Sequence, residues 1–339
     1  MRIGILTGGG DCPGLNAAIR AAVRHGDGEL GINFVGFRDG WRGVVDNDAG
    51  DLTVEDVHGI LPRGGTILGT SGLQPGRLDG GVQKVHDAMA VHRLDGFLVI
   101  GGEGTIGALA QLGVPAIGVP KTIDNDILGT DASIGFTTAA QIATELIDRL
   151  YSTAESHNRV MVCEVMGRHA GWIGWTAGVA AGADVILLPE HPFDIELVCR
   201  RVQEVHAVRR PFSIVVVSEG AMPAAGTMAL PDYPLDANGF PRLGGIGTGV
   251  ADQIGRRTGY ETRVTVLGHV QRGGSPCAFD RVLATRLARA AVDEAAAGRW
   301  GTLVGLRGTE IGTTPVAEVA AGSRLVPEVL WRIPEVLCD

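Results

Sequence analysis

The feature that most constrains this fold is a series of short apolar runs, rich in Ile and Val, that alternate with helical patterns. The runs are Ile3–Leu6, Phe97–Ile100, Ala116–Val119, Val160–Val165, Val185–Leu188, Ile214–Val217 and Val264–Leu267. Continuous apolar runs of this length are typical of strands that are covered on both faces. Between them, apolar residues recur at helical spacing, as in 15–23 and 139–150. The alternation predicts an α/β fold with a mostly parallel sheet.

Length and charge narrow the possible partners. The chain has 339 residues, which suits two domains at about 150 residues each. Its formal net charge is −9, from 29 basic and 38 acidic residues, so it repels nucleic acid and anionic membranes on average. The longest uncharged, mostly apolar stretch, 170–183, is shorter than the about 20 residues of a membrane-spanning helix. We therefore expect neither a nucleic-acid nor a membrane partner.

The cysteines indicate a reducing compartment. They are odd in number and scattered, with no C-x-x-C pair: Cys12, Cys163, Cys199, Cys277 and Cys338. The first residues also lack the apolar core of a signal peptide. We expect reduced thiols in a cytoplasmic protein.

A glycine-rich loop follows the first apolar run. Residues 7–14 read T-G-G-G-D-C-P-G, and a helical pattern comes next. Consecutive glycines let backbone N–H groups gather around an anion at a helix N-terminus. A tight turn without a ligand is the alternative, but it does not need three adjacent glycines. The loop therefore predicts phosphate binding around Gly9 and Gly10.

A second glycine loop, 101–105, carries an acid. Gly102, Glu103, Gly104 and Thr105 follow the run that ends at Ile100. A carboxylate beside bound phosphates makes sense when a cation bridges them, and Mg²⁺ takes one or two carboxylates together with phosphate oxygens. The alternative is that Glu103 is a solvated loop acid.

The same loop also fits a rival motif. Gly102, Gly104 and Gly107 spell G-x-G-x-x-G, and Asp124 lies 20 residues after Gly104, as in dinucleotide-binding proteins. This match keeps an NAD-dependent oxidoreductase open as an alternative. In that motif the acidic residue ends the next strand, whereas here residues 120–123 intervene.

An acidic cluster follows the third run. Residues 120–126 read P-K-T-I-D-N-D, which places Lys121, Thr122, Asp124 and Asp126 at one strand end. One Asp could accept a hydroxyl proton while its neighbour helps to hold a metal. An ordinary Asp suffices for phosphoryl transfer, because the transition state is loose and positioning dominates. An Asx-rich turn is the plain alternative.

Two further loops each place an arginine among glycines just after an apolar run. Arg168 lies in M-G-R-H-A-G (166–171), and Arg272 lies in G-H-V-Q-R-G-G (268–274). Arginine forms bidentate bonds to phosphate, and flanking glycines allow close approach. Arg159 and Arg263 each open an apolar run, where a surface ion pair is the plain alternative.

Together these segments resemble the phosphofructokinase family, in order and over nearly the whole chain. The most specific pieces are T-I-D-N-D, M-G-R-x-x-G and G-H-x-Q-R-G-G. The resemblance implies two similar Rossmann-like three-layer α/β/α domains with mostly parallel sheets and the active site in the cleft between them. Residues 1–138 plus about 251–305 would form the donor domain. Residues 139–250 plus about 306–339 would bind fructose 6-phosphate.

The resemblance also assigns roles. The implied reaction transfers a phosphoryl group from ATP to the 1-hydroxyl of fructose 6-phosphate, the committed step of glycolysis. Asp124 would be the general base, and Thr122 and Arg168 would complete the catalytic set. The donor would be held by Gly9, Gly10, Arg77, Gly102, Glu103, Gly104, Thr105 and Lys121, with Mg²⁺ at Glu103 and Asp126.

The sugar phosphate would be bound by a third implied set: Thr122, Ile123, Asp124, Arg159, Met166, Gly167, Arg168, Glu219, Arg263, His269, Val270, Gln271 and Arg272. Arg159 and Arg263 would reach the 6-phosphate from a neighbouring subunit. We therefore expect a homodimer or homotetramer.

The identity of the donor depends on two positions with opposite implications. Gly104 resembles the ATP-using form, because pyrophosphate users tend to carry Asp there, where it would crowd the α-phosphate and ribose. Lys121 resembles the pyrophosphate-using form. Gly72 stands where the family often has a donor-phosphate Arg, a charge that Arg77 or Lys121 would supply. We expect ATP, because solvent cannot relax a steric clash. Pyrophosphate is the alternative, and a non-catalytic sugar-phosphate sensor is a more distant one.

Overall fold

The computed structural model describes residues 1–208, 211–229 and 243–331. The chain divides into two compact units. The first comprises Met1–Thr138 and Arg272–Arg324, and the second comprises Ala139–Gln271 and Leu325–Asp339. The chain therefore crosses from one unit to the other three times.

The first unit is built on a sheet in the order β12-β11-β5-β4-β1-β2-β3, with β6 paired to β5. Its strands are β1 (Arg2–Gly8), β2 (Asn33–Phe37), β3 (Ala49–Leu52), β4 (Gly96–Gly101), β5 (Ala116–Thr122), β6 (Ile134–Gly135), β11 (Thr302–Arg307) and β12 (Glu310–Pro315). The central strands run parallel, and the edge strands β3 and β12 are antiparallel to their neighbours. The buried runs predicted at 3–6, 97–100 and 116–119 form the three strands β1, β4 and β5.

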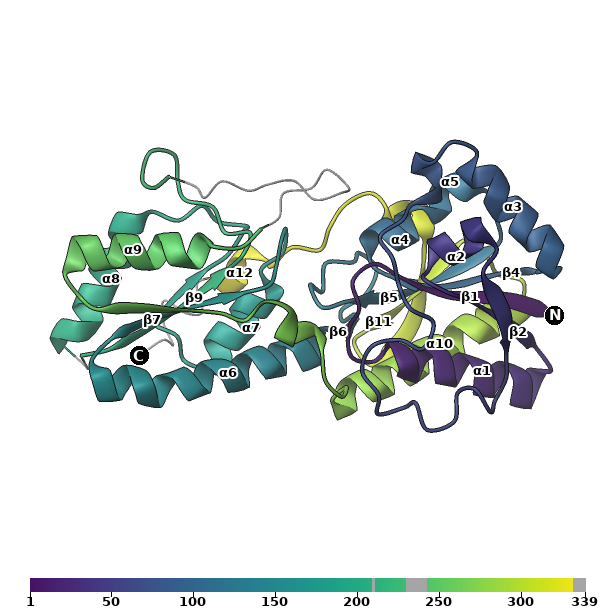
Figure 1. Cartoon of the computed structure of the whole chain (residues 1–339), viewed down its shortest axis with the longest axis horizontal. Helices are drawn as coiled ribbons and strands as arrows, with labels where there is room; N and C mark the ends of the chain where they lie inside the picture. Colours follow the sequence, from purple (N-terminus) through teal and green to yellow (C-terminus); the bar gives the residue numbers. More distant parts are fainter. Residues whose placement is uncertain (209–210, 230–242, 332–339) are drawn as a thin grey trace. The chain divides into compact units, whose positions relative to one another are not determined.

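Helices cover both faces of this sheet (Figure 1). Helices α1 (Leu15–Leu30) and α10 (Ala278–Ala296) pack together on one face. The other face carries α2 (Trp41–Asp46), the 3-10 turn η1 (Pro75–Arg77), α3 (Gly81–His92), α4 (Glu103–Gly107), α5 (Leu109–Leu112) and α11 (Val316–Val319). A core that includes Phe37, Trp41, Phe97 and Ile106 lies between these helices and the sheet.

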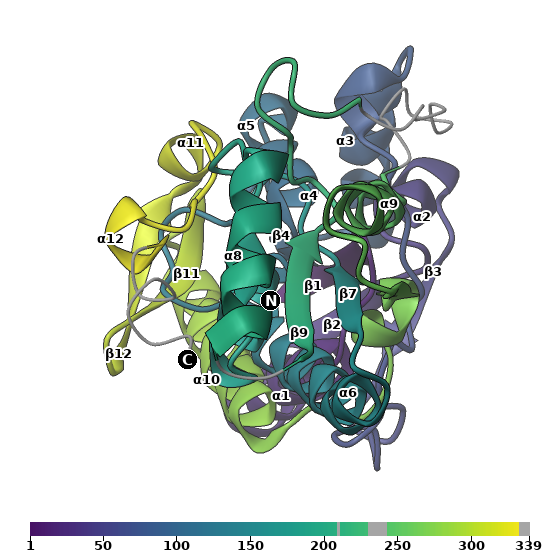
Figure 2. The ribbon, with the colours of Figure 1, turned by 90° about the vertical axis from the view of Figure 1, so that its left-hand side faces the viewer.

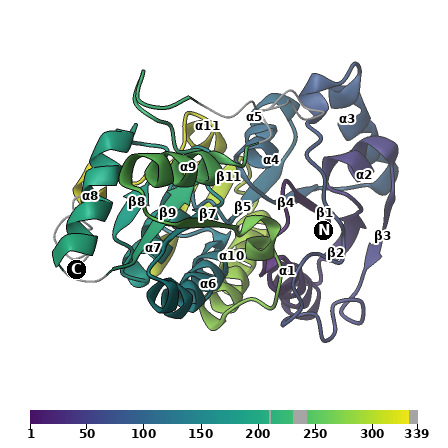
Figure 3. The same cartoon turned by 60° about the vertical axis from the view of Figure 1, so that its left-hand side comes forward.

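The second unit has a four-stranded parallel sheet in the order β10-β7-β9-β8. Its strands are β7 (Val160–Val165), β8 (Val185–Leu187), β9 (Ser213–Ser218) and β10 (Thr262–Val266). Helices α8 (Ile195–Val208) and α9 (Ile246–Thr258) lie on one face, whereas α6 (Phe136–His157) and α7 (Trp172–Ala180) lie on the other (Figures 2 and 3). The turn η2 (Gly268–Arg272) and helix α12 (Glu328–Trp331) complete the described part.

The predicted α/β class with mostly parallel sheets is confirmed, but the boundaries near 251 and 306 need correction. Residues 251–271 belong to the second unit, because β10 pairs with β7. Residues 306–324 belong to the first unit, because β12 pairs with β11. The pairing of β10 with β7, about 100 residues apart, has no local sequence signal, whereas β11 and β12 form a hairpin around Gly308 and Thr309.

Two other expectations can be compared with the described residues. Cys12, Cys163, Cys199 and Cys277 are free thiols, and Cys338 lies outside the described residues. Within the described ranges, we find no helix with the length and apolar character needed to span a bilayer.

Asp280, on α10, fixes the start of α6. This fully buried carboxylate accepts hydrogen bonds from the Gly135 N–H (3.1 Å) and the Thr138 N–H (2.8 Å), and also from the Thr138 hydroxyl. The first N–H groups of a helix have no partner within the helix, so an external acceptor stabilises them. Strand β6, which pairs with β5, and helix α6 are thereby anchored to α10.

We expect Asp280→Ala to lower the free energy of unfolding by about 3 kcal/mol, because it leaves buried N–H donors unpaired. The measurement is urea unfolding followed by circular dichroism. The exposed Asp79 is the control, and Asp79→Ala should leave the midpoint unchanged. Equal midpoints for the two variants would show that Asp280 does not anchor α6.

Candidate active site

Three loops with predicted site residues meet at one edge of the first sheet. Strands β1, β4 and β5 are direct neighbours, and they end at Gly8, Gly101 and Thr122. Gly8 is paired with Gly101, and Gly101 with Pro120, so the ends are in register. The carboxyl edge of an open parallel sheet is where such folds bind ligands.

The glycine loop after β1 is shaped by backbone conformation. Gly9 has a φ of +82° and Gly14, before α1, a φ of +115°, which other residues rarely adopt. The Gly9 N–H donates to the Ser71 carbonyl (2.9 Å), and the Thr70 hydroxyl donates to the Gly9 carbonyl (2.6 Å). Gly9 would therefore help an anion by the absence of a side chain rather than through its own N–H.

Lys121 lies directly under this loop. Its side chain is buried, and its ammonium donates to the carbonyls of Gly8 (2.8 Å) and Gly10 (2.5 Å). Burial lowers the pKa of Lys121, while the nearby carboxylates of Asp11 and Asp124 raise it. A positive charge held between two loop carbonyls both fixes the loop and favours an anion above it.

Arg272 supplies a second cation at the same loop. Its guanidinium donates to the Asp11 carbonyl (3.2 Å) and lies so close to Gly10 that a Cβ there would overlap it. The family resemblance placed Arg272 among the sugar-phosphate contacts. In the structure it belongs to the first unit and packs against the glycine loop, a position that its own motif does not indicate.

The acidic loop after β5 is held rigidly. The Thr122 hydroxyl accepts a hydrogen bond from the Asp124 N–H (3.1 Å). Asn125 adopts a positive φ of 54°, and its side-chain oxygen accepts a hydrogen bond from the Ser133 N–H (2.9 Å). Ile123 is fully buried, whereas Asp124 is partly exposed. These contacts set where the Asp124 carboxylate can point.

The electrostatics of this loop fit a divalent cation. Burial, followed by the negative charges of Asp124 and Glu103, raises the pKa of Asp126 to about 7. Its Oδ1 atom is buried without a hydrogen-bond partner. The described residues contain no cluster of three or more His, Cys, Asp or Glu side chains that could hold a metal alone. Mg²⁺ does not need one, because it takes most of its ligands from water and substrate phosphates.

Sequence reasoning missed two residues that contact this region. The Ser323 hydroxyl donates to Glu103 Oε2 (3.3 Å), and the Arg324 N–H donates to the Asp126 carbonyl (2.7 Å). The Arg324 guanidinium donates to the Asn125 carbonyl (3.2 Å). Both residues lie about 200 positions away in an unremarkable segment, so no motif could have shown them.

A cavity of about 280 Å³ opens beside the second glycine loop. Its lining includes Gln74, Arg77, Glu103, Gly104 and Gly107. A Cβ on Gly104 would lie 2.7 Å from the Gln74 side-chain nitrogen, whereas a Cβ on Gly107 would meet nothing within 4 Å. The space beside Gly104 is therefore sensitive to any side chain at that position.

The second unit holds the Met166–Gly171 loop at the end of β7. Gly167 has a φ of +135°, and its carbonyl accepts the Gly220 N–H (3.1 Å). A Cβ on Gly220 would overlap the Arg168 carbonyl, so Glu219 and Arg168 lie on adjoining loops. Arg168 is partly buried.

The turn η2 packs against that loop through Gln271. This side chain is fully buried, its oxygen accepts the Met166 N–H (3.3 Å), and its nitrogen donates to the Gly268 carbonyl (3.0 Å). Gln271 thus joins two loops, whereas His269 and Val270 are exposed. The resemblance had grouped all three as substrate contacts.

Arg159 and Arg263 converge on one acid. Arg159 is 2.9 Å from the Glu261 carboxylate, and Arg263 pairs with the same group. The hydrogen bond from Arg159, together with the charges of both arginines, lowers the pKa of Glu261. The surface ion pair considered from the sequence is therefore present, and the cluster keeps a net positive charge.

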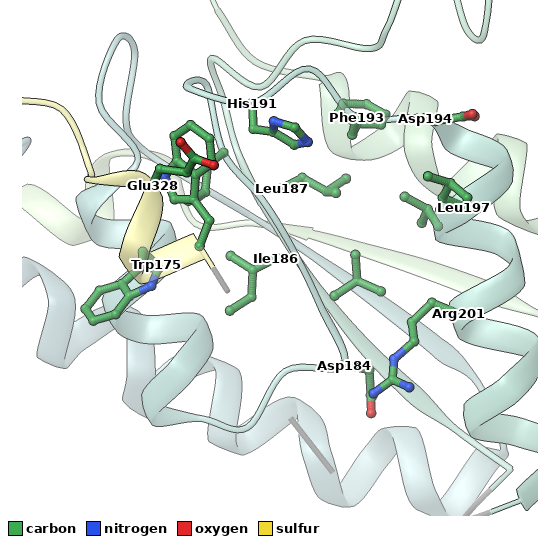
Figure 4. Close-up of a pocket in the computed structure, with 14 residues that line it drawn as sticks. Trp175, Asp184, Ile186, Leu187, His191, Phe193, Asp194, Leu197, Arg201 and Glu328 are labelled. Carbon is green, nitrogen blue, oxygen red and sulfur yellow. The ribbon is translucent and has the colours of Figure 1, made fainter. Parts of the chain in front are cut away.

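A larger cavity, of about 670 Å³, lies elsewhere in the second unit (Figure 4). Apolar and aromatic side chains dominate it, among them Trp175, Ile186, Leu187, Phe193 and Leu197. It contains none of the predicted site residues. Its size does not make it the candidate reaction site, because no glycine-loop residue lines it.

Comparisons with known proteins agree with this geometry. A sequence model of the Phosphofructokinase family matches residues 2–295. The chain belongs to the phosphofructokinase family. It is 54% identical to the pyrophosphate–fructose 6-phosphate 1-phosphotransferase of Streptomyces coelicolor, with 98% of each chain covered. It is 50% identical to the ATP-dependent 6-phosphofructokinase of Mycobacterium tuberculosis, with 97% of each covered.

A solved member of the family has the same fold. The Pichia pastoris phosphofructokinase in the T-state superimposes with a TM-score of 0.82 at 32% identity, over 94% of this chain and 35% of that one. Membership in this family supports phosphofructokinase activity and favours phosphoryl transfer over the dinucleotide alternative. The two named bacterial relatives differ in their phosphoryl donor.

Lys121→Met tests whether the Lys121 ammonium, by holding the glycine loop after β1, supports binding of the phosphoryl donor. We expect the KM for the phosphoryl donor to rise about tenfold or more, because two charge-assisted hydrogen bonds to the glycine loop are lost. The KM for the sugar phosphate should not change. Steady-state kinetics with each substrate varied in turn give both values.

The exposed Lys84 on α3 is the matched control for this variant. Lys84→Met should behave as the unmodified protein does. If Lys121→Met left the donor KM unchanged, the ammonium would not support the donor loop.

Proposed function

We propose that this phosphofructokinase-family protein uses ATP to phosphorylate the 1-hydroxyl of fructose 6-phosphate, giving fructose 1,6-bisphosphate and ADP. The observation that carries the choice of donor is the cavity beside Gly104, whose lining also includes Glu103 of the second glycine loop and Arg77. Pyrophosphate has no nucleoside and needs no such space. ATP has one that must be housed beside its phosphates.

Gly104 keeps that cavity open. An Asp at this position would force the Gln74 side chain aside and would add a negative charge next to Arg77 and Glu103. The ribose and α-phosphate of ATP would meet both obstacles. The cavity therefore supports the steric reason for preferring ATP.

Lys121 does not by itself favour pyrophosphate. Its ammonium is bonded to the carbonyls of Gly8 and Gly10, so it braces the loop on which either donor would rest. Pyrophosphate remains the second candidate, because the Streptomyces coelicolor relative is named for it at 54% identity.

We propose that Mg²⁺ binds between the donor phosphates and the carboxylates of Glu103 and Asp126. The unpartnered, buried oxygen of Asp126 and its raised pKa are the reasons for this choice. When bound, the ion would neutralise charge on the transferred group. Glu103 is oriented by the Ser323 hydroxyl.

Asp124 would act as the general base. Its loop is fixed by the Thr122 hydroxyl and by Asn125, and its carboxylate is accessible to a substrate hydroxyl. In a loose transition state the proton leaves late, so a correctly placed carboxylate is sufficient. Thr122 would contact both the phosphoryl group and the sugar.

The sugar phosphate would be bound by the arginine and histidine loops. Arg168, with Met166 and Gly167, would line the sugar, and Glu219 would accept hydrogen bonds from its hydroxyl groups. His269 and Arg272 would bind the 6-phosphate. We also propose that Arg159 and Arg263 serve the site of a neighbouring copy in a homo-oligomer, since both are presented together at the surface.

The first test is an assay with fructose 6-phosphate and either ATP or pyrophosphate, using Asp124→Asn beside the unmodified protein. We expect turnover with ATP, and a kcat at least about a hundredfold lower in the variant because the base is lost. Asp27→Asn, on the exposed face of α1, is the control and should keep full activity.

Turnover with pyrophosphate alone would overturn the ATP assignment. Equal, negligible transfer by the unmodified protein and by Asp124→Asn, with sugar phosphate still bound, would instead indicate a sensor.

Gly104→Asp tests the cavity argument. We expect a KM for ATP raised about tenfold or more, through the displaced Gln74 and the added charge. Gly28→Ala, on α1, is the control, because its methyl group would meet no atom within 4 Å and Gly28 does not line the cavity. Unchanged KM and kcat for ATP in Gly104→Asp would refute the steric argument.

A further inference from the structure

The segment Ser323–Val326 is hydrogen-bonded to the acidic loop of the first unit and to Glu190 of the second, which in turn binds the loop that carries Arg168. The boundary between the units falls within it, between Arg324 and Leu325. Its first half contacts the acidic loop 120–126 of the first unit. Its second half contacts Glu190 of the second unit. None of these hydrogen bonds is made by the side chain of Asp124 or Arg168.

In the first unit the segment holds both residues that follow Asp124. The Asp126 carbonyl accepts the Arg324 N–H (2.7 Å), and the Asn125 carbonyl accepts the Arg324 guanidinium (3.2 Å). An isolated antiparallel bridge joins Ile127 to Ser323. Because Asn125 is in the left-handed region, these contacts stabilise a conformation that the loop would not favour alone.

In the second unit the link runs through Glu190. One oxygen of this carboxylate accepts the Val326 N–H (2.9 Å) and also the Gly171 N–H (2.9 Å). Gly171 precedes α7 and closes the loop that carries Arg168. The other Glu190 oxygen is buried without a hydrogen-bond partner and would lie 2.9 Å from a Cβ on Gly171.

These contacts imply a role beyond packing. Glu190 is half-buried with one oxygen lacking a hydrogen-bond partner, and an apolar side chain in its place would leave the Gly171 and Val326 N–H groups unpaired. What Glu190 adds is an acceptor that ties the arginine loop to the segment. Arg324 likewise adds a side-chain donor to the carbonyl of Asn125, the residue that follows Asp124.

We propose that Ser323–Val326 is a positioning tether, in which Arg324 orients Asp124 and Glu190 orients Arg168. Neither Arg324 nor Glu190 is a catalytic residue, because each acts through a loop carbonyl or N–H. The kinetic part of the proposal rests on the proposed function.

Glu190→Ala tests the second half of the tether. We expect the KM for fructose 6-phosphate to rise about tenfold, the effect of losing a charged acceptor, with the donor KM unchanged. Glu190→Gln keeps an amide oxygen that can accept both N–H groups, and it should restore the KM. Asp194→Ala removes a different carboxylate that accepts a helix N-terminal N–H in the same unit, and it should leave both values unchanged.

Arg324→Ala tests the first half. We expect kcat to fall about tenfold while the KM for fructose 6-phosphate stays the same, because the base is misplaced and the sugar contacts are not. Arg324→Lys keeps a cationic donor near the Asn125 carbonyl and should recover part of the loss.

Hydrogen exchange measured by mass spectrometry gives a readout without turnover. The peptide that contains Gly171 should exchange faster in Glu190→Ala and return to normal in Glu190→Gln. An unaltered exchange rate, an equal rise in both KM values, or a failure of Gln to rescue would overturn the tether. If the unmodified protein did not phosphorylate fructose 6-phosphate, the proposed function would fail, and the exchange rates would still decide whether Glu190 holds the loop.

Discussion

The two hydrogen bonds from the Lys121 ammonium to the carbonyls of Gly8 and Gly10 are the constraint on which the candidate site of the first unit depends. They join the end of β5 to the loop after β1, across the intervening strand β4. A buried ammonium is costly unless its donors are paired, and here carbonyls pair two of them. The same charge that stabilises the loop also makes its outer face attractive to phosphate.

Much of the candidate site in the first unit could be predicted, because its residues follow their strands directly. Gly8–Gly10, Gly102–Thr105 and Thr122–Asp126 each lie within a few residues of a buried apolar run, and parallel neighbouring strands must bring such loops to one edge. The alternation of strands and helices was enough for the fold class. Family motifs then gave roles that spacing alone left open.

The rest depends on contacts between residues far apart in the chain. Arg272 reaches the glycine loop from more than 250 residues away, and Arg324 reaches Asn125 from about 200. The pairing of β10 with β7 places 262–266 in the second unit, and the pairing of β11 with β5 places the β11–β12 hairpin in the first. Gln271 looks like part of a binding motif, yet its side-chain amide is hydrogen-bonded to the backbone of Met166 and Gly268. Only the folded chain shows which polar groups are already paired.

Whether a polar group is already paired bears directly on the choice of phosphoryl donor. A lysine at position 121 would attract pyrophosphate if its charge were free to approach the second phosphate, but carbonyls on both sides hold the ammonium beneath the loop. A charge fixed there acts on any phosphate at the loop and discriminates poorly between donors. Under the proposed use of ATP, the space beside Gly104 would discriminate between donors, because only ATP carries a nucleoside that has to fit there. We therefore base the proposed choice of ATP on shape at position 104 rather than on charge at position 121.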